Sequence, residues 1–215
     1  MNIGEVIGMG QEKRAYRSPR REAQARETRE RLIAAARRLF ADGGWNGTTL
    51  KAIAREAEVA EPTVYAVFGN KAGLAMALTD TVDDEADVAT LVAELDAAPG
   101  PAHQLEAMAR FEKRMYDGAG DIVRLLHEGA RTNHDLDVAY REGLSRGDAG
   151  RRRVLSGWPT GALRAGLTLD QALDLCSLAL SFEVWDHLAH RGWSSDQIAA
   201  WATAMLTREI LRDQG

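Results

Sequence analysis

The sequence of 215 residues has little of what marks secreted, membrane-bound or disulfide-stabilised proteins. Its single cysteine, Cys176, excludes an internal disulfide framework and a cysteine-rich zinc site. No apolar run approaches the ~18 residues of a membrane span, and the chain does not begin with a signal-peptide pattern. We therefore expect a cytoplasmic protein with no membrane partner. Because Cys176 lies in an apolar stretch, we expect it to be a buried core residue.

Sequence motifs of catalysis are also absent. There is no glycine-rich phosphate loop, no Gly-x-Ser-x-Gly motif and no Cys/His spacing typical of metal ligands. Glu183, His187 and His190 have the i, i+4, i+7 spacing that in principle holds a divalent ion on one helical face. Such a set also arises easily by chance, and Phe182 and Trp185 interleave with it as in a helix packed on several sides. We therefore predict no metal, no cofactor and no enzymatic activity.

Positive charge is concentrated at one end of an acidic chain. The net charge is −5, but residues 1–75 hold 13 Lys/Arg against 9 Asp/Glu, whereas the remainder holds 14 against 23. A basic N-terminal part attached to an acidic body fits a module that contacts nucleic acid. The alternative is that these charges only solvate the surface.

The most informative segment runs from Thr48 to Leu74, with the sequence TTLKAIAREAEVAEPTVYAVFGNKAGL. Its apolar spacing predicts two short helices, each with one buried stripe, joined by a tight turn and followed by the start of a third. Helices this short need a neighbouring helix to complete a core. A helix-turn-helix motif has this packing and presents its second helix to the major groove of DNA.

These residues resemble the DNA-binding region of the tetracycline-repressor (TetR) family of transcriptional regulators. The family pattern is occupied, without a gap, by Thr49, Ile53, Ala54, Ala57, Val59, Thr63, Val64, Tyr65, Phe68, Lys71 and Leu74. The resemblance covers roughly residues 25 to 75. It implies that Glu61, Pro62, Thr63 and Tyr65 lie on or beside the face that enters the groove, and that Thr49, Tyr65 and Lys71 hold phosphates.

The segment departs from the family pattern at two positions. Glu58 stands where the family turn usually has glycine, so a left-handed backbone there would carry a small strain. Pro62 is expected in the first turn of the second helix, where its missing N–H leaves no bond unmade. With Ala60 and Pro62 offering little hydrogen bonding, we expect sparse and partly apolar base readout, for instance of thymine methyl groups.

The rest of the chain has helical patterns and no β-rich run, so we predict an all-α, nine-helix, TetR-like architecture. Residues 1–19 are expected to form a disordered basic arm, either contacting DNA or an untethered tail. Residues 20–75 form the expected DNA-binding domain and 76–215 a ligand-sensing and dimerisation domain. The expected helices cover 20–42, two short helices between 48 and 69, 71–96, 102–117, 121–132, 135–165, 168–190 and 194–212.

Local signals sharpen several of these boundaries. Gly43-Gly44 should end the first helix, Thr48 or Thr49 should cap the second, and Gly69-Asn70 should separate the third from the fourth. Capping boxes begin at Thr168 and Ser194. Trp158-Pro159 should kink or break the 135–165 helix. That helix also repeats glycine every three or four residues, which predicts either a close helix approach, room for a ligand or a weak helix.

An apolar ligand cavity in the middle helices is implied by the family resemblance rather than by the spacing, since such stripes are more often ordinary core. Its expected lining is Met108, Phe111, Met115, Leu126, His127, Arg131, Tyr140, Trp158 and Trp185, with Glu112, Tyr116 and Glu128 as further candidates. In the family the last two helices usually form a four-helix bundle with a second subunit. The expected dimer contacts are Leu178, Phe182, Trp201 and Met205, although these residues could equally fill the subunit core.

We therefore expect a ligand-responsive, sequence-specific regulator of transcription. Its partners would be a double-stranded palindromic DNA operator, a small apolar or amphipathic effector of unknown identity, and a second copy of the chain. A repressor released by its effector is the first interpretation. The alternatives are an activator, a ligand-independent regulator of the same fold, or a helical carrier or enzyme that retains the motif.

Overall fold

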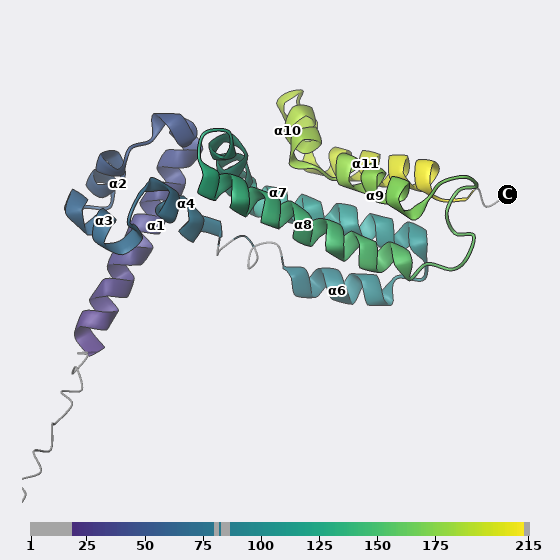
Figure 1. The fold of residues 1–215 in the computed structure, drawn as a ribbon, viewed down its shortest axis with the longest axis horizontal. Coiled ribbons are helices and arrows are strands. Elements are labelled where there is room, and N and C mark those ends of the chain that lie inside the picture. Colours follow the sequence, from purple (N-terminus) through teal and green to yellow (C-terminus); the bar gives the residue numbers. More distant parts are fainter. Residues whose placement is uncertain (1–18, 80–81, 83–86, 213–215) are drawn as a thin grey trace, which may run out of the picture.

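The computed structural model describes residues 19–79, 82 and 87–212, which form a bent row of helices (Figure 1). Apart from one isolated bridge between Leu163 and Leu211, the regular structure of these residues is helical. The all-α class predicted from the sequence is therefore confirmed. Among the same residues, no helix is both long and apolar enough to cross a membrane.

Four helices form the N-terminal unit: α1 (Pro19–Gly47), α2 (Leu50–Glu56), α3 (Glu61–Phe68) and α4 (Lys71–Thr79). The path of α1 is interrupted at Gly44, whose φ of 63° only glycine adopts freely. Thr49 caps α2, because its Oγ1 accepts a hydrogen bond from the Ala52 amide at 3.1 Å. Thr48 is instead buried and donates its hydroxyl to the Leu39 carbonyl. The helix expected to end at Gly43-Gly44 is interrupted at Gly44 but continues to Gly47, whereas the predicted cap at Thr49 is confirmed.

The two turns around α3 have the predicted geometry. Glu58 has a left-handed backbone with φ of 53°, and Pro62 lies in the first turn of α3. Gly69 ends α3 with φ of 74°. Asn70 begins α4, since its Oδ1 accepts a hydrogen bond from the Gly73 amide at 2.8 Å.

Over residues 87–212, six helices form the larger part: α6 (Val88–Ala97), α7 (Pro101–Ala130), α8 (His134–Ser156), α9 (Leu169–Ala179), α10 (Phe182–His190) and α11 (Ser195–Ile210). The long α7 and α8 lie side by side, with α6 along one side and α9 and α11 along the other (Figure 1). Both predicted capping boxes, at Thr168 and Ser194, are present. The helix expected to break at Trp158-Pro159 ends at Ser156, as the proline requires.

Four expected helices are divided differently from the prediction. The 71–96 stretch is α4 and α6, and Asp87 caps the latter. The 102–117 and 121–132 stretches are one helix, because Ala119 is fully buried and the small residues there let α7 run straight past α1. The 168–190 stretch is split into α9 and α10, because Ser181 caps a new helix by accepting from the Val184 amide. Of the arm predicted over residues 1–19, residues 1–18 lie outside the described residues and Pro19 begins α1.

Two hydrophobic cores organise the molecule. The second lies between α7, α8, α9 and α11 and contains Cys176, which is fully buried as predicted. The first core is not confined to the N-terminal unit. It joins α1–α4 to the C-terminal half of α7 and the start of α8, through Ile122, Leu125 and Leu136. The N-terminal unit therefore shares its core with the body and is not a separately packed domain.

The tightest contact in this shared core is at Gly129 on α7. A Cβ atom placed there would come within 2.3 Å of the Leu136 Cδ1 and 3.3 Å of the Trp45 indole. Trp45 stacks on Phe40 with ring centroids 6.0 Å apart. Gly129 therefore sets how closely α7 approaches the end of α1.

This contact leads to a first prediction. Gly129→Ala should lower the free energy of unfolding by about 1–3 kcal/mol, because the added methyl overpacks the shared core. Gly143→Ala is the matched control, because it lies in α8 with open space around its Cα. This second change should raise stability by about 0.5–1 kcal/mol through helix propensity. Urea denaturation of both variants measures the difference, and equal effects would contradict the packing role of Gly129.

Candidate functional site

The α3 helix turns a small, mostly apolar face outward. Val64 is fully buried and fixes the inner side of the helix. At 100° per residue, Pro62 and Ala66 lie opposite it, and both are exposed. Tyr65 flanks this face with half of its surface exposed, and Thr63 flanks it on the other side and is half-buried. Of the predicted groove residues, Glu61 is also half-buried, in the first turn.

Two cations near this face were not predicted from the sequence. Lys51 and Arg55 lie one turn apart on the exposed side of α2, whose inner side is formed by Leu50, Ile53 and Ala54. Their i, i+4 spacing, out of phase with the buried residues, is the sequence signal that identifies them. Thr49 is exposed at the N-terminus of the same helix, where backbone N–H groups favour an anion.

The turn between α2 and α3 is held from α1. The Arg31 guanidinium donates to the carbonyl oxygen of Ala57 and lies 3.4 Å from that of Glu58. It also approaches the Glu58 carboxylate at 3.5 Å. Arg29 stacks its guanidinium over the Phe68 ring at 5.4 Å. These contacts fix the position of α3 relative to α1, although residue 58 is not glycine.

Lys71 was expected to bind a phosphate, but in this structure its side chain packs against the end of α1. Its ammonium donates to the carbonyl oxygen of Trp45 and lies 4.3 Å from the centre of the Trp45 ring. Partial burial lowers the pKa of Lys71. In this structure the ammonium therefore joins the start of α4 to the end of α1, instead of projecting from the helix terminus.

The N-terminal unit is bound to the body by charged contacts from α7. Arg37 on α1 forms a two-pronged ion pair with Asp121, with N–O distances of 2.7 and 2.9 Å. Glu128, in the last turn of α7, accepts from the Trp45 amide at 3.4 Å. From the same stretch of α7, Arg124 pairs with Asp186 on α10. This part of α7 thus contacts α1 and α10 together.

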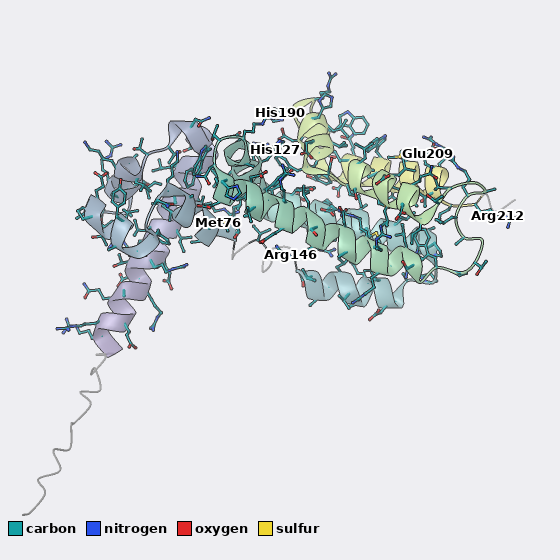
Figure 2. All side chains as sticks on the ribbon, viewed as in Figure 1. Met76, His127, Arg146, His190, Glu209 and Arg212 are labelled. Carbon is teal, nitrogen blue, oxygen red and sulfur yellow. The ribbon has the colours of Figure 1, made fainter. Side chains whose placement is uncertain are left out.

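The nine residues expected to line one cavity are divided between two cores. Leu126 and Tyr140 belong to or pack against the first core, whereas Met108, Trp158 and Trp185 belong to the second. Of the other four, Phe111, Met115 and His127 are half-buried and Arg131 is exposed. The reason for the division is that α7 spans both cores, so residues spaced along it do not converge. His127 lies on α7 beside α10 (Figure 2), stacked on Tyr140 at 5.4 Å and edge-on to Phe182.

The second core contains one buried charged pair. Glu112 on α7 is 6% exposed and accepts a 3.0 Å bond from Arg151 on α8. Burial raises the pKa of the Glu112 carboxyl to about 7, although Arg151 and Tyr116 act in the opposite direction. Gly147 is what makes room for this pair, because a Cβ atom there would lie 3.0 Å from the Arg151 guanidinium. The predicted glycine repeat of this helix is thus explained at one position, whereas Gly143 and Gly150 face open space.

The expected dimer residues also divide. Phe182 lies inside the subunit, 5% exposed and packed against Tyr116, so its side chain has little surface left for a partner. Leu178 is 61% exposed. Together with Trp201 it lines a groove of about 690 Å³ between α9, α10 and α11. Met205 is half-buried against the second core.

The candidate metal ligands do not converge on one point. Glu183 accepts the Tyr140 hydroxyl at 3.0 Å, and His190 is held by the Asp186 carbonyl at 2.8 Å. His187 is exposed and lines the groove beside Leu188. No cluster of three or more metal-binding side chains occurs in the part of the chain that the structure describes.

This geometry defines a helix-turn-helix unit built into a larger helical body, and comparison with known proteins agrees. Residues 32–78 match the model of the bacterial regulatory proteins of the tetR family. The chain carries the DNA-binding region of the TetR family of transcriptional regulators and has their fold, which confirms the resemblance predicted from the sequence. No curated protein matches the chain in sequence.

Three solved structures illustrate the shared fold. NalD of Pseudomonas aeruginosa, the secondary repressor of the MexAB-OprM multidrug efflux pump, is 22% identical with a TM-score of 0.66 over 89% of this chain and 100% of that one. The ketosteroid regulator KstR2 of Mycobacterium tuberculosis is 16% identical, with a TM-score of 0.63 over 86% and 95%. FadR of Bacillus subtilis, in complex with stearoyl-CoA, is 18% identical, with a TM-score of 0.63 over 82% and 95%.

Replacing Lys71 by methionine should change stability, whereas replacing Lys51 by methionine should change DNA affinity. Lys71→Met should lower the free energy of unfolding by about 1 kcal/mol, because it removes a hydrogen bond and a cation–π contact. Lys51→Met should leave stability unchanged within about 0.5 kcal/mol. It should instead lower DNA affinity on all sequences and reduce the slope of log K against log salt by about 1. Thermal denaturation and binding titrations at several salt concentrations test this, and an unchanged melting temperature for Lys71→Met would contradict its role in packing.

The buried carboxyl of Glu112 should make stability depend on pH. Since folding raises its pKa from 4.5 to about 7, the folded protein binds the proton more tightly than the unfolded chain. Its contribution is therefore full below the unfolded pKa and is lost as pH rises towards 7. Relative to Glu112→Gln, the wild type should lose up to about 1.4 kcal/mol per pH unit in this window. Urea denaturation from pH ~4.5 to ~8 measures this loss of stability, with Glu106→Gln, at an exposed position, as the control. If the free energy of unfolding depends on pH in the same way in all three proteins, the pH dependence does not come from Glu112.

Proposed function

We propose that the protein is a homodimeric transcriptional repressor that binds a palindromic DNA operator and leaves it when a small apolar or amphipathic molecule binds the body. The observation that carries this proposal is the outward face of α3, set on a unit that shares its core with the long helix α7. A unit that only bound DNA would not need to share a core with α7, which also forms part of the core of the body.

The DNA contacts in this proposal are of two kinds, with bases from α3 and with phosphates from α2. Pro62, Thr63 and Tyr65 on α3 enter or border the major groove, with Glu61 at its edge. Thr49 at the start of α2 holds a phosphate, and so do the exposed cations Lys51 and Arg55. Lys71 acts indirectly, by keeping α4 against the end of α1.

Dimerisation in this proposal uses the groove between α9, α10 and α11. Leu178 and Trp201 are apolar residues on its surface, which otherwise costs free energy in contact with water. A second copy placed there by a two-fold axis covers this surface and presents two α3 helices to half-sites about 34–36 Å apart.

The effector in this proposal binds the body near α7, where apolar surface and polar groups lie together. Phe111 and Met115 are half-buried on α7, and Glu112 on the same stretch of α7 forms its buried ion pair with Arg151 of α8. FadR, which has the same fold, was solved in complex with stearoyl-CoA, a molecule that combines a long apolar chain with a polar head. This supports an amphipathic effector class without identifying the molecule.

The response follows from α7 contacting both α1 and α10. An effector that changes the position of α7 moves Asp121, and with it Arg37 and the N-terminal unit. For such a shift to release DNA, the effector must bind more tightly to the arrangement whose α3 spacing does not match the operator. The contact between Arg124 and Asp186 carries the same displacement to the dimer groove.

The test combines selection of genomic DNA fragments with a variant of the dimer groove. The purified wild type should enrich a palindrome at low salt, and DNA without it should bind far more weakly. Leu178→Glu replaces an exposed side chain and should leave the helical content unchanged. It should convert the dimer to a monomer in analytical ultracentrifugation and lower affinity for the palindrome at least tenfold. Absence of any enriched palindrome would refute the repressor, and a dimeric Leu178→Glu would refute the proposed interface.

A further inference from the structure

We infer that the effector is a carboxylic acid with an apolar body, and that its carboxylate binds Arg151 in place of Glu112, which takes up a proton. This inference rests on the proposed function and specifies the chemistry of the effector. The residues that carry it lie on the stretch of α7 and α8 between the two cores.

Helix α8 is buried only at its two ends. Its buried residues are Leu136, which belongs to the first core, and Leu155, which belongs to the second. Between them, Gly143 and Gly147 lie within ~20° of Leu136 around the helix, on the side that faces α7. Among the described residues, nothing outside the helix backbone lies within 4 Å of a Cβ position at Gly143, and the nearest atoms at Gly147 are those of the Arg151 guanidinium. The inner side of α8 thus leaves open space between the two cores.

This space is bordered by apolar side chains and ends at an ionisable pair. On α7, Met115 follows Glu112 by three residues, so it lies on the same side of the helix, and it is half-buried. On α8, Leu144 is 43% exposed. Gly143 and Arg151 are eight residues apart, or ~12 Å along the helix, which is roughly the length of an extended chain of ten carbons. The space therefore suits an apolar chain whose polar head reaches Arg151.

Arg151 has hydrogen-bonding capacity that the protein does not use. Its guanidinium donates 3.0 Å bonds to Glu112 and, within α8, to Asp148. Its Nε atom is buried and has no hydrogen-bond partner in the part of the chain that the structure describes. A buried donor left unpaired costs free energy, and a carboxylate can accept from two nitrogens of a guanidinium at once. Arg151 is therefore able to bind a further carboxylate.

The balance of charge decides which carboxylate is replaced. Two carboxylates already lie beside Arg151, so a third is accommodated only if one of them becomes neutral. Although desolvation acts in the opposite direction, hydrogen bonds from Ser177 and Arg151 lower the pKa of Asp148, which therefore stays ionised. Burial raises the pKa of Glu112 to about 7. Glu112 is thus the carboxylate that accepts a proton at little cost.

The remaining ionisable groups near this pair stay neutral. Burial raises the pKa of Tyr116, on the same helix as Glu112, and that of Cys176, on α9, so both are protonated near pH 7. The charged residues of α11 are paired outside this core. A proton from the solvent therefore joins Glu112 as the carboxylate of the effector takes its place on Arg151. The net charge of the core is the same before and after.

The experiment compares acids with alcohols of the same chain length. Octanoate, decanoate and dodecanoate, and the matching primary alcohols, are titrated into the full-length protein without DNA by isothermal titration calorimetry at pH ~6 and ~8. At least one acid should bind about tenfold more tightly than its alcohol at pH ~6, because only the acid forms charge-assisted hydrogen bonds with Arg151. Across buffers of different ionisation enthalpy, the acid should bind with uptake of nearly one proton at pH ~8 and almost none at pH ~6.

The affinity should show the same linkage. Because the acid binds the form of the protein in which Glu112 is protonated, its affinity should fall about tenfold from pH ~6 to ~8. The alcohol brings no charge to Arg151, so its affinity should change by less than about twofold over the same range.

Protein variants assign the two roles. Glu112→Gln imitates the protonated carboxyl, so it should bind the acid without proton uptake and with the same affinity at both pH values. Arg151→Met should remove the preference for the acid over the alcohol. Arg152→Met is its matched control, because Arg152 is the next residue of α8 and is exposed, and it should keep both the preference and the proton uptake. Circular dichroism checks the fold, and Glu112→Gln decides the question if Arg151→Met is unfolded.

The outcomes distinguish this inference from the proposed function. If no acid binds, or if acid and alcohol bind equally, the carboxylate site at Arg151 is refuted, while an enriched palindrome would still support the repressor. Binding of an acid without proton uptake at pH ~8, or proton uptake that persists in Glu112→Gln, would refute the exchange with Glu112. If an acid binds with proton uptake but does not release the palindrome in fluorescence anisotropy, the carboxylate site is supported and the release step of the proposed function has failed.

Discussion

The close approach of α7 to the end of α1 is the constraint on which the rest of the structure depends. At Gly129 there is no space for a methyl group between α7, Trp45 and Leu136. Trp45 in turn receives Lys71 from α4, and α4 follows directly after α3. Thus the position of α3 is determined through a series of contacts that begins at α7. Movement of α7 at this point must be transmitted, because a close-packed core does not absorb it.

A second constraint is electrostatic. Glu112 and Arg151 place two ionisable groups in the apolar core of the body, where desolvation of their charged forms is costly and a hydrophobic pair of similar size would often be as stable. Gly147 keeps space for the guanidinium on the side of α8 that faces α7. An arrangement that costs stability in this way is more easily understood as part of a binding or switching function than as a means of holding helices together.

Much of this fold could be predicted from the sequence because its signals are local. Capping at Thr49, Thr168 and Ser194 depends on residues within three positions, and so do the positive φ angles at Glu58 and Gly69. One local signal was missed, because the Ser181 cap divides the 168–190 stretch into two helices. The structure also adds contacts between residues that are distant in the sequence. Lys71 was assigned to phosphate because its contact with Trp45, 26 residues earlier, leaves no trace in local spacing. Likewise, the expected cavity mixed residues of two cores, since helical periodicity shows which face is buried but not which neighbour covers it.

The inward and outward residues of α3 are separate, and this has an evolutionary consequence. Val64 faces inward and holds the helix in place, whereas Pro62 and Ala66 face outward and take no part in either core. In the proposed DNA complex, substitutions at the two outward positions would alter DNA preference at little cost to folding. Descendants of one stable scaffold can in this way acquire separate sets of target genes, and a designer could redirect the protein by changing two side chains.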